Sequence, residues 1–375
     1  MNSSLTQTTL SEDSIRSLIR LRGSLPSDHR VTAWKYLLRL PGNSRAFHEL
    51  LSRGPEPTVV ANLALRYPVR NRKLFRKTIV LMSALAHWSP IWAEVEFAIP
   101  WTFPFVLLFG QDDLGAFEAA MSFLLHWGSR MLVTFPQPPV PVLVGMELAL
   151  RRVDRELSAH LKSLSMGALC YGWPLLQSAF SEVLARDEWL RLMDRVFASV
   201  DRPELLEAAA VAFVVASRAW LLACRSTAEA QAFFRRPQPS VDVGEMLRVM
   251  EKVCRFGSPE RWSRGRVIAA IGTAAGSDAE KRPRKEIIED VDGTMAALAV
   301  LRLAPRRFEP LTAGVYPHFD GYPQFVVNYQ ADLREMVAKQ EKDKERKRRL
   351  VNELELRTRS IADEYGATDQ KDVEV

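Results

Sequence analysis

Apolar side chains recur every three to four residues along most of this chain, a spacing typical of amphipathic helices. The stretch "SEDSIRSLIRLRG" places Ile15, Leu18 and Ile19 on one such face. Ser11 stands at the expected N-cap, and Gly23 stands where the helix should stop. We therefore predict a first helix between these two residues.

The next stretch, "PSDHRVTAWKYLLRLPG", repeats the same design between Pro26 and Gly42. Further helical patterns cover 43–53, 56–66, 70–88, 114–134, 141–163, 174–184, 187–199, 203–224 and 241–255. Strand patterns are almost absent, and no helix repeats another at a fixed period. The sequence predicts an all-α fold of many helices rather than a solenoid.

One run is apolar enough to suggest a membrane span, "LLEAAAVAFVVASRAWLLAC" from Leu205 to Cys224. It is long enough to cross a bilayer, but Glu207 and Arg218 interrupt it. We expect a buried helix of a large domain there, and no transmembrane segment.

Composition narrows the class of protein. A length of 375 residues allows one large domain or two, and 47% hydrophobic with 26% charged residues is ordinary for a globular protein. A net charge of +6 is too small to indicate nucleic-acid binding. The three cysteines have no paired spacing and the N-terminus is polar, so a cytoplasmic protein in a reducing compartment is expected.

Two regions break the helical pattern. Residues 256–290 are small and charged, which predicts a surface loop or insertion, and the "KRPRK" within it is interpreted as incidental charge rather than a localisation or phosphate-binding patch. Residues 339–349 hold seven basic and three acidic side chains and no apolar one. We predict a projecting charged helix over 331–365, which could begin a coiled coil, and disorder over 1–9 and 366–375.

A search for chemistry finds no catalytic or metal-binding motif. The six histidines show no paired ligand spacing, and the glycines match no phosphate-binding loop. Asp112 and Asp113 directly precede a helical pattern, so they are interpreted as an N-cap and a first-turn charge rather than a catalytic pair. No metal and no cofactor is expected.

Two stretches, "GSLPSDHRVTAWKYLLRLPGN" and "YGWPLLQSAFSEVLARDEWLRLMDRVFA", resemble core motifs of the TBC domain family, the Rab GTPase-activating fold. The resemblance runs from about Leu10 to Gln330, so 10–330 is predicted to be a TBC-like domain. The core positions that it implies are Arg30, Trp34, Trp173, Phe180, Trp189 and Asp194.

The stretches "MSALAHWSP", "WPLLQSAFSEVL" and "YPHFDGYPQFVVNYQ" are also similar to a WD40-associated branch of this family that is linked to centriolar satellites and cilia. That branch carries a WD40 region before the TBC domain, whereas this sequence begins almost at the first TBC motif.

The resemblance implies a dual-finger mechanism for catalytic members. An arginine in Ile-x-x-Asp-x-x-Arg-Thr-Phe-Pro neutralises charge on the transferring phosphoryl group, and a glutamine in Tyr-x-Gln-Gly-Met positions the attacking water. With Pro68 as anchor, Val59 takes the Ile position and Asn62 the Asp position. Leu65 then stands in place of the arginine.

Arg66 lies one residue beyond the finger position, about 100° further around a helix, so we expect it to point away from the nucleotide. In the second motif, Glu94 falls at the tyrosine and Glu96 at the glutamine. A carboxylate there would add negative charge to a negative transition state. A one-residue gap would bring Arg66 into register, and this alternative stays open.

Three functions follow from these residues. The first is a noncatalytic scaffold that binds centriolar or ciliary proteins. The second is an active Rab GTPase-activating protein that uses Arg66, and the third is a Rab effector that binds the GTPase without hydrolysing its nucleotide. In each case the partner is a protein.

Overall fold

The computed structural model of the chain describes residues 11–67, 69–238, 241–257, 308–322, 338–349 and 351–353. These residues form helices joined by turns, with no strand among them. The chain divides into two compact units between Gly321 and Tyr322. Within the described parts, no helix is both long and apolar enough to cross a membrane.

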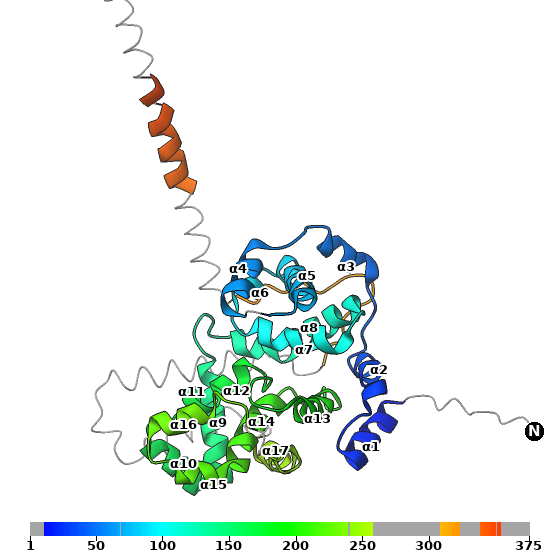
Figure 1. Cartoon of the computed structure of the whole chain (residues 1–375), viewed down its shortest axis with the longest axis vertical. Coiled ribbons are helices and arrows are strands. Elements are labelled where there is room, and N and C mark those ends of the chain that lie inside the picture. The colour runs from blue at the N-terminus through cyan, green and yellow to red at the C-terminus, as the bar shows by residue number, and fades with distance from the viewer. Residues whose placement is uncertain are drawn as a thin grey trace, which may run out of the picture. The chain divides into compact units, whose positions relative to one another are not determined.

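The N-terminal helices of the first unit, coloured blue to cyan in Figure 1, are α1 (Glu12–Arg22), α2 (Ser27–Leu37), α3 (Ser44–Leu51), α4 (Pro57–Arg66), α5 (Arg72–Trp88), α6 (Ile91–Glu94), α7 (Ala98–Phe109) and α8 (Asp113–His126). After the short 3-10 helix η1 (Gly128–Leu132) follow α9 (Val140–Val153), α10 (Arg155–Ser163), α11 (Ala168–Tyr171), α12 (Trp173–Gln177), α13 (Arg186–Phe197), α14 (Leu205–Ala216), α15 (Arg218–Ala223), α16 (Thr227–Phe233) and α17 (Val243–Gly257).

Two long helices predicted from the sequence are each broken at a polar residue. Asp154 ends α9 and caps α10, where its carboxylate accepts a hydrogen bond from the Leu157 backbone (2.9 Å). Ser217 separates α14 from α15. The membrane-like run is therefore two helices, and its charges are paired: Glu207 with Arg130 and Arg218 with Asp154.

Helix α7 was not among the predicted helices, and its sequence "AIPWTFPFVLLF" contains two prolines, which disfavour a helix interior. Pro100 lies in the first turn, where backbone N–H groups have no acceptor within the helix, so its missing N–H costs no hydrogen bond. Pro104 lies inside the helix. The Thr102 hydroxyl donates to the Ala98 carbonyl (2.8 Å), and burial of most of α7 outweighs the local cost. The predicted helix over 174–184 is also wrong in its second half, since Ala179 and Phe180 have positive φ.

The core is organised around the buried carboxylate of Asp194 on α13. Its Oδ1 accepts hydrogen bonds from Trp34 Nε1 (2.8 Å) and Arg30 Nε (3.1 Å), and its Oδ2 accepts one from the Leu25 backbone (2.7 Å). The guanidinium of Arg30 also donates to the Leu25 carbonyl (2.6 Å). Residues far apart in the sequence therefore hold α2 against α13.

Aromatic rings extend this contact into the rest of the unit. Trp34 is fully buried and meets Phe105 of α7, and Trp189 and Phe197 of α13, edge to face. Trp189 donates from its indole to the Ala179 carbonyl (2.8 Å). The two sequence motifs thus pack on each other through one indole.

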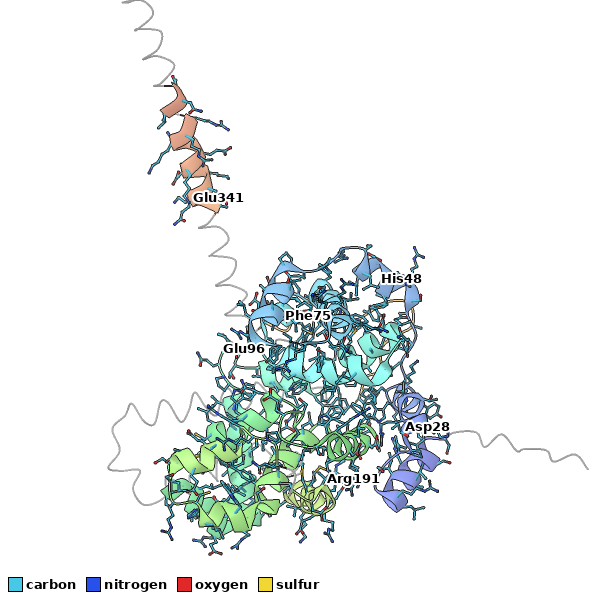
Figure 2. All side chains as sticks on the ribbon, viewed as in Figure 1. Asp28, His48, Phe75, Glu96, Arg191 and Glu341 are labelled. Carbon is cyan, nitrogen blue, oxygen red and sulfur yellow. The ribbon has the colours of Figure 1, made fainter. Side chains whose placement is uncertain are left out.

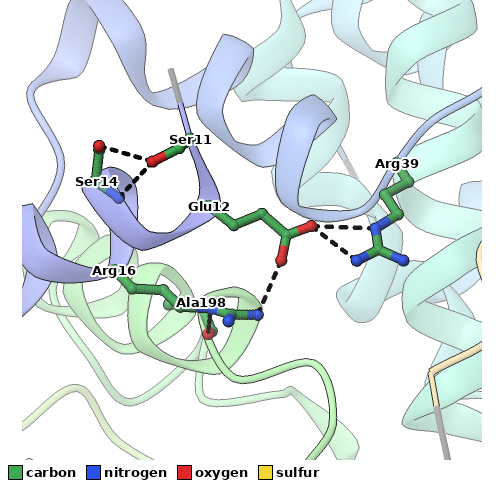
Figure 3. A network of polar contacts seen from close by, with 6 residues as sticks. All are labelled: Ser11, Glu12, Ser14, Arg16, Arg39 and Ala198. Atoms are coloured by element: carbon green, nitrogen blue, oxygen red, sulfur yellow. Dashed lines mark hydrogen bonds and ion pairs between the residues drawn. The ribbon is translucent and has the colours of Figure 1, made fainter. Parts of the chain in front are cut away.

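Helix α1 is attached by a polar network that Figure 3 shows in detail. Arg39, just after α2, donates to Glu12 at 2.8 Å, and Arg16 donates both to Glu12 (3.1 Å) and to the Ala198 carbonyl (3.0 Å). Ser11 caps α1, as predicted, by accepting from the Ser14 backbone (3.1 Å). One carboxylate therefore links the first helix to the end of the second.

Apart from Tyr322, the second unit is described over 338–349 and 351–353, which are helical with every side chain exposed, as the sticks around Glu341 show in Figure 2. This agrees with the charged helix predicted there, although the rest of 331–365 lies outside the described residues. The predictions for 1–9 and 366–375 lie outside them too. Of 256–290, only the last two residues of α17 are described.

Trp34→Ala is expected to destabilise the protein by about 4 kcal/mol, because it empties a fully buried site and removes a donor from Asp194. Trp173 is only partly buried and meets Phe97 at one edge, so Trp173→Ala should cost about 1–2 kcal/mol. Urea unfolding measures both. Equal losses would contradict the central place given to Trp34.

Candidate functional site

The candidate site lies where the C-terminal end of α4 meets α6. Pro57 opens α4, and the Glu56 side chain caps it by accepting from the Val59 backbone (2.7 Å). With the start set in this way, Val59, Asn62 and Arg66 follow at spacings of three and four and share one face. That face is directed toward α6 and the residues after it.

Each of these three side chains meets a partner from that segment or from the core. Val59 is buried, and the Asn62 amide donates to the Ala93 carbonyl (3.0 Å). Arg66 Nη1 pairs with Glu96 Oε1 at 2.5 Å. The residues assigned to the two finger motifs by the sequence resemblance are thus brought together, and Arg66 is paired with Glu96.

The side chains enclose a small pocket of about 90 Å³, lined by Val59, Asn62, Arg66, Tyr67, Met82, Trp92, Ala93, Glu94, Val95, Glu96 and Ile99. Burial is the main cause that raises the pKa of Tyr67, and the carboxylates of Glu182 and Glu96 add to it. The charged side chains that line the pocket are Arg66, Glu94 and Glu96. Among the described residues, no group of three or more His, Cys, Asp or Glu side chains is placed to hold a metal ion.

Arg66 lines this pocket and Leu65 does not, although Leu65 takes the finger position in the motif register. The helix stays regular to Arg66, so seven residues after Val59 bring its side chain back to the same face, about 20° away. The Leu65 side chain points about 100° away from Arg66 around the helix axis and is 82% exposed. The motif register put the finger at Leu65, whereas the helix geometry puts the only pocket-lining cation at Arg66.

Behind the pocket lies an aromatic sandwich that the sequence motifs did not reveal. Phe319 stacks on Trp92 (centroids 5.6 Å apart) and on Trp88 (5.7 Å). Trp88 Nε1 donates to the Pro317 carbonyl (2.8 Å), while Trp92 Nε1 is buried with no hydrogen-bond partner. One wall of the pocket therefore rests on a ring from the far end of the unit.

Residues 308–321, which we call the strap, supply that ring and run among the N-terminal helices (orange in Figure 1). Tyr316 donates to the buried carboxylate of Glu118 (3.1 Å), which also accepts from the Asn43 backbone (2.7 Å). The Asn43 side chain in turn donates to the Thr312 carbonyl (2.8 Å). The quoted "YPHFDGYPQF" is thus, over its described residues, a structural element that supports the pocket.

The family core residues lie elsewhere. Arg30, Trp34 and Asp194 gather in one hydrogen-bonded cluster, and Trp189 joins it through ring contact. Phe180 is fully buried, and Trp173 is partly exposed beside Phe97. None of the six lines the pocket, so their part is to hold the fold.

Comparison with known proteins decides the relationship. No family model matches the chain. It is 34% identical over 346 residues to TBC1 domain family member 31 of Xenopus tropicalis, and 30% identical over 348 residues to the protein of that name from Homo sapiens. The chain is a relative of the TBC domain proteins. These alignments cover 92% and 93% of the chain but 28% and 29% of the relatives, so it spans less than a third of their length.

The fold comparison agrees with this relationship. The crystal structure of the Ypt/Rab-GAP domain of Gyp1p superposes with a TM-score of 0.54, covering 68% of this TBC-related chain and 95% of that one. At 12% identity the likeness concerns the fold alone. The all-α Rab-GAP fold predicted from the sequence is confirmed.

Phe319→Ala should lower the stability of the first unit by about 2 kcal/mol, because two stacked ring contacts are lost. Since Trp88 and Trp92 both touch that ring, the tryptophan emission should also shift to longer wavelength. Val315→Ala is the matched control, because Val315 lies in the same strap and is 71% exposed. Equal effects of the two substitutions would contradict the assigned role of Phe319.

Proposed function

We propose that this chain is a noncatalytic TBC-domain adapter that uses its fold and charged C-terminal helix to bind proteins in the cytoplasm, in centrosome-, basal-body- or cilium-related trafficking. The observation that carries the proposal is the Arg66–Glu96 pair at the rim of the pocket. The sequence resemblance to the centriolar branch of the family supports the setting.

The chemistry of hydrolysis explains why this pair argues against catalysis. A finger arginine must place its whole charge on the transferring phosphoryl group, where it contributes on the order of 10³- to 10⁵-fold in rate. In this chain the Glu96 carboxylate accepts a hydrogen bond from the Arg66 guanidinium. Two negative charges about 4 Å apart repel by about 4 kcal/mol at an effective dielectric constant of about 20. The Glu96 carboxylate would therefore repel the transferring phosphate, whereas a neutral glutamine at this position would not.

One observation favours a second candidate, a Rab GTPase-activating protein that works through Arg66 alone. Arg66 lines the pocket on the same helix face as Asn62. Its ion pair with Glu96 is exposed, because the Arg66 side chain is 51% and the Glu96 side chain 61% exposed to solvent. Exposed ion pairs contribute about 0–1 kcal/mol, so a bound GTPase could separate them. A third candidate, a Rab effector, needs the same surface but no hydrolysis.

The decisive comparison is hydrolysis by a panel of GTP-loaded Rab GTPases with the full chain or with Arg66→Ala. We expect neither protein to raise the rate, because Glu96 occupies the glutamine position. A hundredfold acceleration that Arg66→Ala abolishes would establish the enzyme instead. GTP-dependent binding of a Rab without acceleration, compared with the GDP-loaded form, would establish the effector.

Removing residues 335–375 is expected to leave the melting temperature of the first unit unchanged, because every described side chain in 338–349 is exposed and the strap remains. Binding to centriolar or ciliary proteins in a ciliated-cell lysate should be lost with this segment. The full chain provides the control. A truncated protein that unfolds, or that keeps every partner, would remove the tail from the adapter proposal.

A further inference from the structure

A basic surface that the proposed function does not use begins four residues after Arg66. From Pro57 to Ala93 the sequence contains six basic residues and no acidic one. Arg66 and Lys77 are neutralised by Glu96 and Asp113. The remaining four, Arg70, Arg72, Lys73 and Arg76, are all exposed, and none of them forms an ion pair with another described residue; we call them the basic patch.

The packing of α5 sets the direction of this patch. The larger buried side chains of its second half, Thr78, Leu81, Met82 and Leu85, lie on one side of the helix, while the small residues Ser83, Ala84 and Ala86 are buried around the rest of that half. At about 100° per residue, Arg72, Lys73 and Arg76 fall on the opposite side, together with Val80, which is 40% exposed. Lys77 borders them and is tied to Asp113 Oδ1 (2.7 Å) and to the Gly110 carbonyl. Phe75, labelled in Figure 2, marks this turn of α5.

The position of these cations is not explained by stability. Arg72 and Lys73 occupy the first turn of α5, directly after the N-cap Asn71. A positive side chain there opposes the helix dipole, and acidic residues are the favoured choice. The chain therefore gathers cations where the fold alone would select the opposite charge.

We infer that the basic patch docks this chain on an anionic lipid surface through acidic phospholipid headgroups. The patch projects from the outer side of a helix and carries one sign of charge, which suits a diffuse layer of headgroups that needs no matching shape. A protein partner would instead call for a patch with an apolar centre and paired charges of both signs. The cations start within about 14 Å of Arg66, since four residues can span no more.

The test is co-sedimentation of the full chain with phosphatidylcholine vesicles, with or without about a third phosphatidylserine. The wild type should bind only the vesicles with phosphatidylserine, and less at high salt. Arg72→Glu/Lys73→Glu should weaken that binding at least about 20-fold, because each cation near such a surface contributes about fivefold. Its melting temperature should be equal or higher, because the new charges suit the helix dipole.

The matched control is Arg235→Glu/Arg236→Glu, which makes the same charge change at two exposed arginines elsewhere in the first unit. It should bind within about twofold of wild type, since long-range charge is screened beyond about 10 Å. Equal losses in the two variants, no loss in the patch variant, or binding to phosphatidylcholine alone would overturn the inference. Patch-dependent binding to polyglutamate without vesicle binding would also overturn it, and would assign the patch to an acidic protein.

Discussion

The fold of the first unit depends on one buried carboxylate. Asp194 accepts hydrogen bonds from Arg30, Trp34 and the backbone of Leu25, and it is fully buried. Burial raises its pKa, while the Arg30 guanidinium and the other donors oppose that rise. Removing one partner of such a group leaves an unpaired buried charge, at a cost of about 3–5 kcal/mol. The positions of α2 and α13 are therefore not independent, and each presents its aromatic side chains to the other.

The pocket is built by other constraints and lies outside that cluster. The register of α4 brings Arg66 to the face of Val59 and Asn62, and the segment after α6 brings Glu96 to meet it. The strap then holds Trp92 from behind through Phe319. A relative that keeps the core cluster can thus keep the TBC fold while the chemistry at the pocket changes, because the two sets of residues share no member.

The core residues could be found from the sequence because short motifs contain them. Arg30, Trp34 and Asp194 were singled out by resemblance to the TBC motifs, and in the structure the Asp194 carboxylate accepts hydrogen bonds from the other two side chains. Prediction from the sequence failed where long-range packing decides. The breaks at Asp154 and Ser217 leave the apolar period almost intact, and the burial that sustains α7 despite Pro104 comes from neighbouring helices. Phe319 meets Trp88 from the far end of the unit, and no local pattern indicates such a contact.

The candidate site shows the same division. Alignment to Pro68 put Leu65 at the finger position and Arg66 one residue beyond it, whereas in the structure Arg66, on the face shared with Val59, lines the pocket. The basic patch was overlooked because a net charge of +6 for the whole chain hides a segment with no acidic residue. Charge counted along individual segments would have found it.

The proposed noncatalytic function requires that the carboxylate of Glu96, and not the orientation of Arg66, keeps the pocket from catalysis. Single-turnover GTP hydrolysis by a panel of Rab GTPases tests it directly, with wild type, Glu96→Gln, and Glu96→Gln combined with Arg66→Ala. The account predicts no acceleration by wild type, at least about tenfold acceleration by Glu96→Gln, and loss of that gain in the double variant. Equal rates with wild type and Glu96→Gln would contradict it.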